Sequence, residues 1–302
     1  MNMNRRNFLK SSGLMLGAVP LSDMLDFNTS QTVLRVGLVG CGGRGVGAAA
    51  QALAADSNVH IVALADVFED QIDQALHSLR KKDSHRVQVP AERKYVGFDS
   101  YKKLIDQDID VVLLCSPPNF RPDHLAYAVQ KGIHIFCEKP MAVDIPGLKK
   151  VMDSVKLSKI KNLSVVSGFC FRYLQPNREI VTRVADGQIG EIQSINTFRF
   201  GGDLTIRKRT ANMSDLEYQL RNWYYFQRYA SDLIVEQSIH SVDYMNWVMQ
   251  NKLPISVHAT GGRQSREWDG IGNTYDHFAV EYDYGDGEGY SFCPSAKRYR
   301  IT

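Results

Sequence analysis

Short apolar runs alternate with segments of helical spacing along the chain from residue 33 onward. The run Val-Val-Leu-Leu-Cys at residues 111–115 is apolar at every position, as a strand covered by helices on both faces must be. The alternation predicts an α/β domain with a doubly wound parallel sheet. The expected strands are residues 33–39, 59–65, 111–115, 133–137 and 164–168. The expected helices are residues 46–53, 69–79, 100–105, 122–131 and 146–158.

The pattern changes after about Gly168, where longer runs alternate between apolar and polar positions. Such runs predict the strands of a mostly antiparallel open sheet. One helix, expected over residues 231–249, interrupts them. The expected strands are residues 191–200, 255–261 and 274–284.

Two domains follow from this change of pattern, the first over residues 31–165 and the second, of α+β type, over residues 166–302. The chain ends soon after a hairpin-like turn at residues 283–287. Because an α+β domain of this kind usually has further strands, we expect the second domain to be incomplete at its C-terminus.

Residues 1–30 have the pattern of an export signal rather than of a folded domain. Arg5-Arg6-Asn7-Phe8-Leu9-Lys10 precedes a small and apolar run that is too short to span a bilayer. This order predicts a twin-arginine signal, with the export machinery as a partner and the periplasm as the location. No clean small-x-small cleavage site follows, so a retained N-terminal anchor is left open.

Charge and cysteine content exclude several classes of protein. The 302 residues include 36 basic and 33 acidic side chains without a long run of either sign, which argues against a nucleic-acid partner. The odd number of cysteines and the absence of C-x-x-C spacing predict mainly buried free thiols, with no disulfide framework and no metal site. The five are Cys41, Cys115, Cys137, Cys170 and Cys293.

A glycine-rich turn follows the first expected strand and opens a helix. In this G-x-G-x-x-G pattern, Gly40 permits the tight turn, Gly42 lets a pyrophosphate approach the backbone, and Gly45 allows close strand and helix packing. The helix N-terminus offers free N–H groups and a positive dipole end to the phosphates. The sequence therefore predicts a Rossmann dinucleotide site. Its loop residues are Gly40, Gly42, Gly43, Arg44 and Gly45.

Asp66 bears on the choice of cofactor. It ends the second expected strand, where a carboxylate hydrogen-bonds both hydroxyls of the adenosine ribose. A carboxylate there repels a 2'-phosphate, and the next four residues contain no arginine. We therefore expect NAD in preference to NADP.

Two further segments lie at carboxyl ends of strands, where doubly wound sheets bind their ligands. Ser116-Pro117-Pro118-Asn119 follows the central strand, and Cys137-Glu138-Lys139-Pro140 follows the next one. With these motifs, residues 33–284 resemble the glucose-fructose oxidoreductase and inositol dehydrogenase family, known as Gfo/Idh/MocA. Glu-Lys-Pro is the most specific motif of the resemblance.

The resemblance implies a reaction centre. Lys139 takes the role of the family's motif lysine, which lies beside the nicotinamide and hydrogen-bonds the reacting oxygen. The family's second-domain motif places an acid four residues before a histidine, which matches Glu236 and His240. On one helix these two side chains would share a face. His240 would accept the hydroxyl proton, and Glu236 would orient its imidazole or bind a substrate hydroxyl.

Further positions match the family less specifically. The loop at Pro118 borders the cofactor, and the Lys139–Pro140 bond is a candidate for the cis form. His124 matches a cofactor position or packs in its helix, and Trp223 stacks on a sugar ring or belongs to the core. The expected cofactor residues are thus the loop above with Asp66, Ser116, Pro117, Pro118, Asn119, His124, Glu138 and Lys139. The expected substrate residues are Arg172, Tyr173, Trp223 and Asp243.

Three functions are consistent with these motifs. The first is an NAD-dependent oxidoreductase, expected as a homo-oligomer, acting on a sugar or polyol hydroxyl with a tightly held cofactor. The second is a glycoside hydrolase that oxidises the sugar transiently, eliminates the aglycone and reduces the sugar again. The third is a truncated homologue without catalysis. The retained Glu-Lys-Pro motif favours the oxidoreductase.

Overall fold

The computed structural model describes residues 33–202, 204–266, 272–285, 291–292 and 295–297. The expected signal at residues 1–30 and Cys293 therefore lie outside the described residues. Among the residues that are described, no helix has both the length and the apolar content that crossing a bilayer requires.

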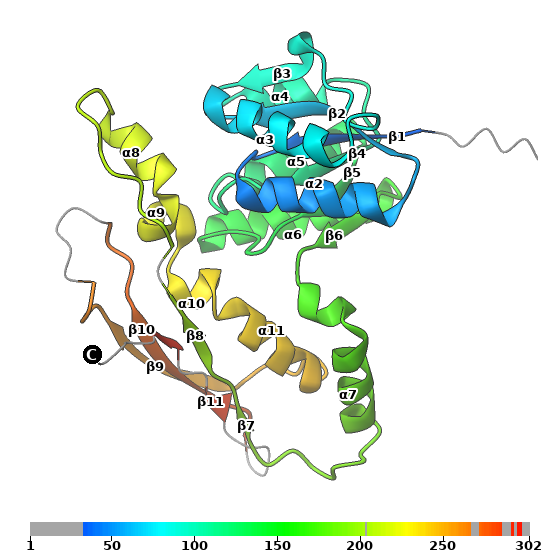
Figure 1. The fold of residues 1–302 in the computed structure, drawn as a ribbon. Helices are drawn as coiled ribbons and strands as arrows, with labels where there is room; N and C mark the ends of the chain where they lie inside the picture. The colour runs from blue at the N-terminus through cyan, green and yellow to red at the C-terminus, as the bar shows by residue number, and fades with distance from the viewer. Residues whose placement is uncertain (1–32, 203, 267–271, 286–290, 293–294, 298–302) are drawn as a thin grey trace, which may run out of the picture. The chain divides into compact units, whose positions relative to one another are not determined.

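A six-stranded parallel sheet in the order β3-β2-β1-β4-β5-β6 forms the first part of the chain (Figure 1). All five pairings are parallel, and the order is that of a Rossmann sheet. The doubly wound fold is thus confirmed. The strands are β1 (Leu34–Val39), β2 (Val59–Asp66), β3 (Lys94–Val96), β4 (Val111–Leu114), β5 (His134–Cys137) and β6 (Val165–Ser167).

Helices cover both faces of this sheet because successive side chains of each strand point to opposite sides. Leu38 and Leu64 pack with helices α2 and α3, whereas the adjacent Val39 and Ala65 pack with α4, α5 and α6. Both leucines are fully buried, which stabilises the sheet by roughly 1.5–3 kcal/mol each. The helices are α2 (Gly43–Ala55), α3 (Glu69–Lys82), η2 (Ala91–Arg93), α4 (Ser100–Ile105), α5 (Arg121–Lys131) and α6 (Ile145–Ile160).

The second part of the chain has a mixed, mostly antiparallel sheet of short strands in the order β7-β11-β10-β12-β8, with β9 also on β10. Strand β10 pairs antiparallel with β9, β11 and β12, and the outer pairs β11–β7 and β12–β8 are parallel. The strands are β7 (Ile195–Asn196), β8 (Arg199–Gly201), β9 (Ser256–Gly262), β10 (His277–Asp283), β11 (Ser291–Phe292) and β12 (Ser295–Lys297).

Helices in this part depart from the sequence prediction. The prediction of a single helix over residues 231–249 is wrong, because the segment forms two helices that are separated at residues 237–238. The single strand expected over residues 191–200 is replaced by β7 and β8. The helices are η3 (Cys170–Tyr173), α7 (Gln175–Ala185), α8 (Asp215–Arg221), η4 (Trp223–Tyr225), α9 (Gln227–Ala230), α10 (Leu233–Glu236) and α11 (Ile239–Val248).

Asp232 fixes where α10 begins. Its buried carboxylate accepts hydrogen bonds from the backbone N–H groups of Leu233 and Tyr275 and from the side chain of Gln227. The first of these caps α10, as an aspartate at a helix N-terminus does. The bond from Tyr275, which comes from the sheet region, ties the start of α10 to a segment that no local pattern marks.

Candidate active site

Two glycines of the loop occupy positions where only glycine fits. Gly40 has a φ of +92°, and a Cβ added there would lie 2.5 Å from the backbone nitrogen of Ser116. A Cβ on Gly45 would lie 1.9 Å from the carbonyl oxygen of Gly40. At Gly42 and Gly43, in contrast, nothing lies within 4 Å of an added Cβ. The loop is therefore packed tightly against β1 and β4 but faces open space on its other side.

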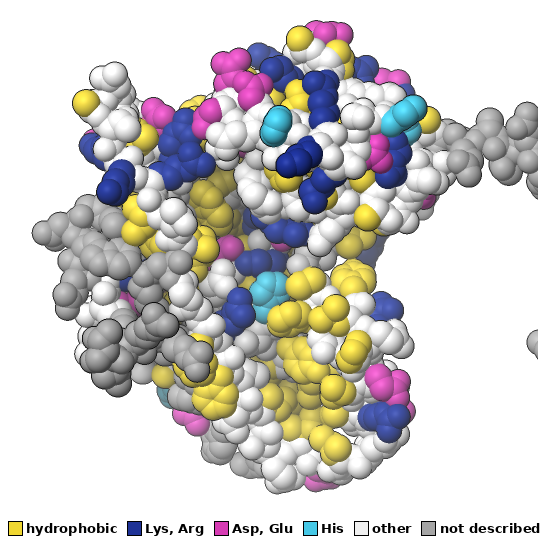
Figure 2. All heavy atoms as spheres, viewed as in Figure 1, with side chains coloured by type: hydrophobic (Ala, Val, Ile, Leu, Met, Phe, Trp, Pro, Cys, Tyr) yellow, Lys and Arg dark blue, Asp and Glu magenta, His cyan; other side chains and the backbone are white. Residues whose placement is uncertain are grey.

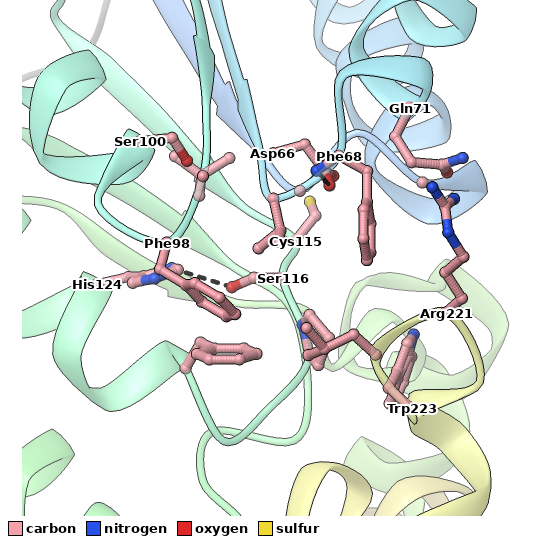
Figure 3. A pocket seen from close by; sticks show the side chains of 18 of the residues that line it. Asp66, Phe68, Gln71, Phe98, Ser100, Cys115, Ser116, His124, Arg221 and Trp223 are labelled. Carbon is pink, nitrogen blue, oxygen red and sulfur yellow. Dashed lines mark hydrogen bonds between the residues drawn. The ribbon is translucent and has the colours of Figure 1, made fainter. Parts of the chain in front are cut away.

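That open space is a pocket at the carboxyl ends of β1, β2 and β4, and Figure 3 shows the side chains around it. Seven of the predicted cofactor residues line it: Gly40, Gly42, Gly43, Asp66, Ser116, Pro117 and His124. The other predicted cofactor residues are not among its lining residues; they are Arg44, Gly45, Pro118, Asn119, Glu138 and Lys139.

Asp66 is held by the backbone beside the glycine loop. One carboxylate oxygen accepts from the N–H of Cys41 at 2.7 Å, and the other accepts from the N–H of Phe68 at 3.0 Å. Burial raises the pKa of the Asp66 carboxyl, and these backbone donors oppose that rise. Since each oxygen keeps a further lone pair, the carboxylate can still accept hydrogen bonds from two ribose hydroxyls.

Ser116 and His124 form a buried pair on the opposite wall of the pocket (Figure 3). The Ser116 hydroxyl lies 3.0 Å from Nδ1 of His124, and the Tyr101 ring stacks on the imidazole at 4.0 Å. Burial lowers the pKa of His124 to about 3, so this imidazole is neutral near pH 7. His124 therefore positions Ser116 and packs beneath the pocket.

Arg44 and Glu138 join the two cofactor motifs. The Nε of Arg44 donates to Oε1 of Glu138 at 2.6 Å, with the carboxylate buried and the guanidinium half exposed. Gly168 leaves room for this carboxylate, because a Cβ there would lie 2.9 Å from Oε2. Glu138 thus fixes the glycine loop relative to the segment that carries Lys139.

Lys139 lies at the point where the two parts of the chain meet. Its ammonium donates to Oε1 of Glu236 at 2.9 Å and also to the Glu236 carbonyl oxygen. The predicted cis form of the Lys139–Pro140 bond is confirmed. Pro140 is held by Arg121, a buried residue whose guanidinium donates to the Pro140 carbonyl oxygen at 2.5 Å. Sequence reasoning missed Arg121. Its only local signal is a charge within the apolar pattern of a helix.

Glu236 and His240 do not share one helix face as predicted, because Glu236 ends α10 and His240 lies near the start of α11. Glu236 is 7% exposed, and its carboxylate binds Lys139 rather than His240. Burial raises the pKa of Glu236, and the Lys139 ammonium opposes this. The carboxylate therefore neutralises the buried lysine instead of orienting the imidazole.

His240 carries a free proton-accepting position. Its Nδ1 is buried without a hydrogen-bond partner among the described residues, and its ring packs against Phe171 at 5.0 Å. Burial lowers the pKa of His240, and the positive charges of Lys139 and Arg199 lower it further. Arg199 was not predicted; its guanidinium donates to the Gln237 side chain at 2.8 Å.

The predicted substrate residues occupy different positions. Arg172 and Asp243 bind each other at 2.9 Å, and the Arg172 guanidinium lies 5.4 Å from the centre of the Trp247 ring. Tyr173 is 58% exposed, and Trp223 lines the pocket beside the glycine loop. Trp223 is thus brought to the cofactor side, and the structure does not bring the four residues together.

The pocket also contains residues that sequence reasoning did not select. Phe68 lies two residues after Asp66, which is the only local signal for it. Others come from distant segments, so no local pattern reveals them. They include Phe98, Phe120, Arg207, Leu220 and Arg221. Figure 2 shows Lys and Arg side chains gathered beside a recessed part of this face.

These features fit a dinucleotide. The loop is open at Gly42 and Gly43, α2 begins there with no acidic residue in its first turn, and Asp66 lines the pocket at the end of β2. Oδ1 of Asn119 is buried without a partner in the described part of the chain, which leaves an acceptor beside the pocket. Within the same residues, no group of three His, Cys, Asp or Glu side chains is placed to hold a metal ion.

The four cysteines within the described residues are free thiols, as predicted. Cys41 and Cys137 are buried. Cys170 is exposed and is an exception to the expectation of mainly buried thiols. Burial raises the pKa of Cys115 to about 12 and that of Cys137 to about 11, so neither is a thiolate near pH 7.

Known proteins share both the sequence pattern and the fold. An alpha-N-acetylgalactosaminidase from Shewanella oneidensis is 25% identical over 213 residues, covering 63% of this chain and 44% of that protein. Glucose-6-phosphate 3-dehydrogenase from Bacillus subtilis is 24% identical over 217 residues, covering 67% of this chain and 55% of that protein. The chain spans about half the length of these curated relatives.

Two solved structures show the same fold. Myo-inositol 2-dehydrogenase from Lactobacillus plantarum has a TM-score of 0.68 at 21% identity, covering 88% of this chain and 70% of that one. GenD2 from gentamicin A biosynthesis, in complex with NAD, has a TM-score of 0.67 at 17% identity. The match covers 88% of this chain and 66% of GenD2. Residues 34–166 also match the family model for oxidoreductases of the Gfo/Idh/MocA type with an NAD-binding Rossmann fold. The first part of the chain is therefore similar to the Gfo/Idh/MocA oxidoreductases over their NAD-binding Rossmann fold.

Proposed function

We propose that this chain is a nicotinamide-dependent oxidoreductase that acts on a hydroxyl group of a sugar or polyol. The observation that carries the proposal is the position of Lys139, which follows the strand next to the pocket and binds Glu236 of the second part at 2.9 Å. His240, four residues further on, has an imidazole nitrogen without a partner among the described residues. The charge of Lys139 lowers the pKa of His240, so a cation and a base lie within electrostatic range of each other.

Lys139 has the geometry to bind the reacting oxygen. An ammonium has three N–H donors, and two of those of Lys139 are directed at the carboxylate and the carbonyl of Glu236. The third is available for the substrate oxygen, where positive charge stabilises developing alkoxide character. Glu236 holds this lysine in place and offsets the cost of burying its charge.

His240 would accept the proton of the substrate hydroxyl. Because its pKa lies below the usual value, the imidazole is neutral near pH 7 and ready to act as a base. A nicotinamide dinucleotide, when bound, supplies the acceptor for the two electrons that leave the carbon. Asp66 supports NAD over NADP, because its charge would face a 2'-phosphate.

A glycoside hydrolase is the second candidate function. The alpha-N-acetylgalactosaminidase similarity favours it, because such an enzyme on this fold would start from the same oxidation of a sugar hydroxyl. The same Lys139 and His240 would serve that step, so the site geometry is compatible with both reactions.

A screen of the purified chain distinguishes the candidates. The chain is incubated with NAD and a panel of sugars, polyols and nitrophenyl glycosides, while reduced nicotinamide and free nitrophenol are measured together. An oxidoreductase gives reduced nicotinamide in proportion to substrate, whereas a hydrolase gives nitrophenol without net reduction. If neither product forms with a chain that binds NAD, the proposal of a catalytic site is wrong.

A further inference from the structure

The pocket beside the glycine loop is closed in part by the second half of the chain. Residues 207–223 supply four of its lining residues, and Figure 3 shows Arg221 and Trp223 reaching it from the segment opposite Asp66 and Phe68. The lining residues from this segment are Arg207, Leu220, Arg221 and Trp223.

Arg221 fastens this segment to the rim of the pocket. Its NH1 and NH2 groups donate to the two carboxylate oxygens of Asp70 at 3.0 and 2.9 Å. Its guanidinium carbon also lies 4.0 Å from the centre of the Phe68 ring, within the range of a cation–π contact. Asp70 and Phe68 flank the start of α3, next to the carboxylate of Asp66. The contact therefore crosses the pocket at its Asp66 end.

The segment is held as a unit behind Arg221. The buried side chain of Asn222 accepts from the backbone N–H of Arg207 at 2.8 Å and donates to the Arg207 carbonyl at 3.1 Å. Glu217 binds the Nε of Arg221 at 2.8 Å and orients its guanidinium. Opening the pair with Asp70 therefore releases the whole segment rather than one side chain.

The ion pair is strong for a contact near the surface. The Arg221 side chain is 14% exposed and that of Asp70 is 42% exposed. The hydrogen bonds from Arg221 hold the pKa of the Asp70 carboxyl below its usual value, and the charge of Arg207 lowers it further. Bidentate geometry adds specificity to such a pair, although solvent on the Asp70 side weakens it.

We propose that Arg221 is a cofactor-retaining residue. Its contacts with Asp70 and Phe68 hold residues 207–223 over the adenosine end of the pocket, so a bound dinucleotide leaves only after these contacts open. This inference rests on the proposed function, because it requires NAD in the pocket. A slowly released cofactor suits an enzyme that returns its electrons within one catalytic cycle, and it suits export of a loaded protein by the proposed twin-arginine signal.

The test measures release of NAD from the full chain. Purified protein is loaded with NADH, and its dissociation is followed by fluorescence after excess NAD is added. For Arg221→Gln we expect NADH to dissociate about 10-fold faster than from the unchanged protein. We expect no larger increase, because Asp70 is partly exposed and solvent weakens its bond to Arg221. Asp70→Asn should reproduce this increase, and the double variant should add little to either single change. Arg228→Gln is the matched control, because this exposed arginine lies over Tyr229 just beyond the segment and does not line the pocket.

Each outcome has a separate meaning. If Arg221→Gln stays folded by circular dichroism and releases NADH at the unchanged rate, the inference is wrong and the proposed function stands. If Asp70→Asn slows release, Arg221 binds the cofactor directly and the role assigned to the ion pair is wrong. If the unchanged chain binds no dinucleotide, the proposed function fails together with the inference.

Discussion

The two parts of this chain are built differently. The two large clusters of buried hydrophobic residues in the described structure are formed between Val36 and Val165. Their members lie on the strands of the parallel sheet and on the segments that cover it. Beyond Gly168 the strands are short, and large apolar side chains such as Phe198 and Leu253 are 60% and 78% exposed. The first part is therefore a rigid platform, and the second part depends more on individual polar contacts.

This difference separates two kinds of site residue. The cofactor pocket is formed mainly by backbone geometry of the platform, as the steric limits at Gly40 and Gly45 show. The proposed reaction centre consists of side chains from both parts, and Lys139 and Glu236 bind each other there. Variants of the platform should thus change cofactor binding, and variants of the reaction centre should change turnover.

The largest expected effect is on turnover. Lys139→Ala and His240→Ala should each slow reduction of bound NAD by a substrate from the screen by at least ~100-fold, the usual scale for losing one general acid or base. NAD affinity should change little, since neither residue lines the cofactor pocket. Because both would serve one transfer, the double variant should lose much less than the product of the single losses.

Matched controls for this experiment are Lys150→Ala and His258→Ala, which alter exposed residues away from the pocket. Both should keep normal turnover. Losses that multiply fully, or near-normal turnover in Lys139→Ala or His240→Ala, would remove the pair from the proposed mechanism.

A smaller effect is expected at Asp66. Asp66→Ser removes the charge that repels a 2'-phosphate, so the preference for NAD over NADP should narrow by about 10-fold. Titration of both cofactors against the unchanged and altered chains measures this. Turnover with saturating NAD should be preserved, and equal affinities in the unchanged chain would contradict the assignment of Asp66 to the ribose.

The smallest effect concerns pH. In the proposed mechanism His240 is a neutral base, and its pKa is lowered from the ordinary 6.5 by burial and by two cations. Activity should therefore persist below pH 6.5 and fall only as pH drops through the lowered pKa. Arg199→Gln removes one cation, so the acidic limb of kcat/KM should move to higher pH by less than about one unit. A limb that moves to lower pH would show that Arg199 acts differently.

Local sequence patterns specify the platform. Short, largely apolar runs predicted five of its six strands, because strands covered by helices on both faces carry few polar side chains. The missed strand, β3, has three residues and a half-exposed Val96, so it carries no such run. The glycine spacing and Asp66 also located the pocket, since backbone turns of this kind are encoded within a few residues.

The contacts that complete the proposed reaction centre and the pocket arise only in the folded chain. Spacing suggested that Glu236 serves His240, yet the helix is interrupted at residues 237–238 and Glu236 binds Lys139. Lys139 and Glu236 are 97 positions apart, and Arg221 and Asp70 are 151 positions apart. Such pairs leave no periodic signal, because a buried or half-buried charge selects its partner by distance in space after the chain has folded.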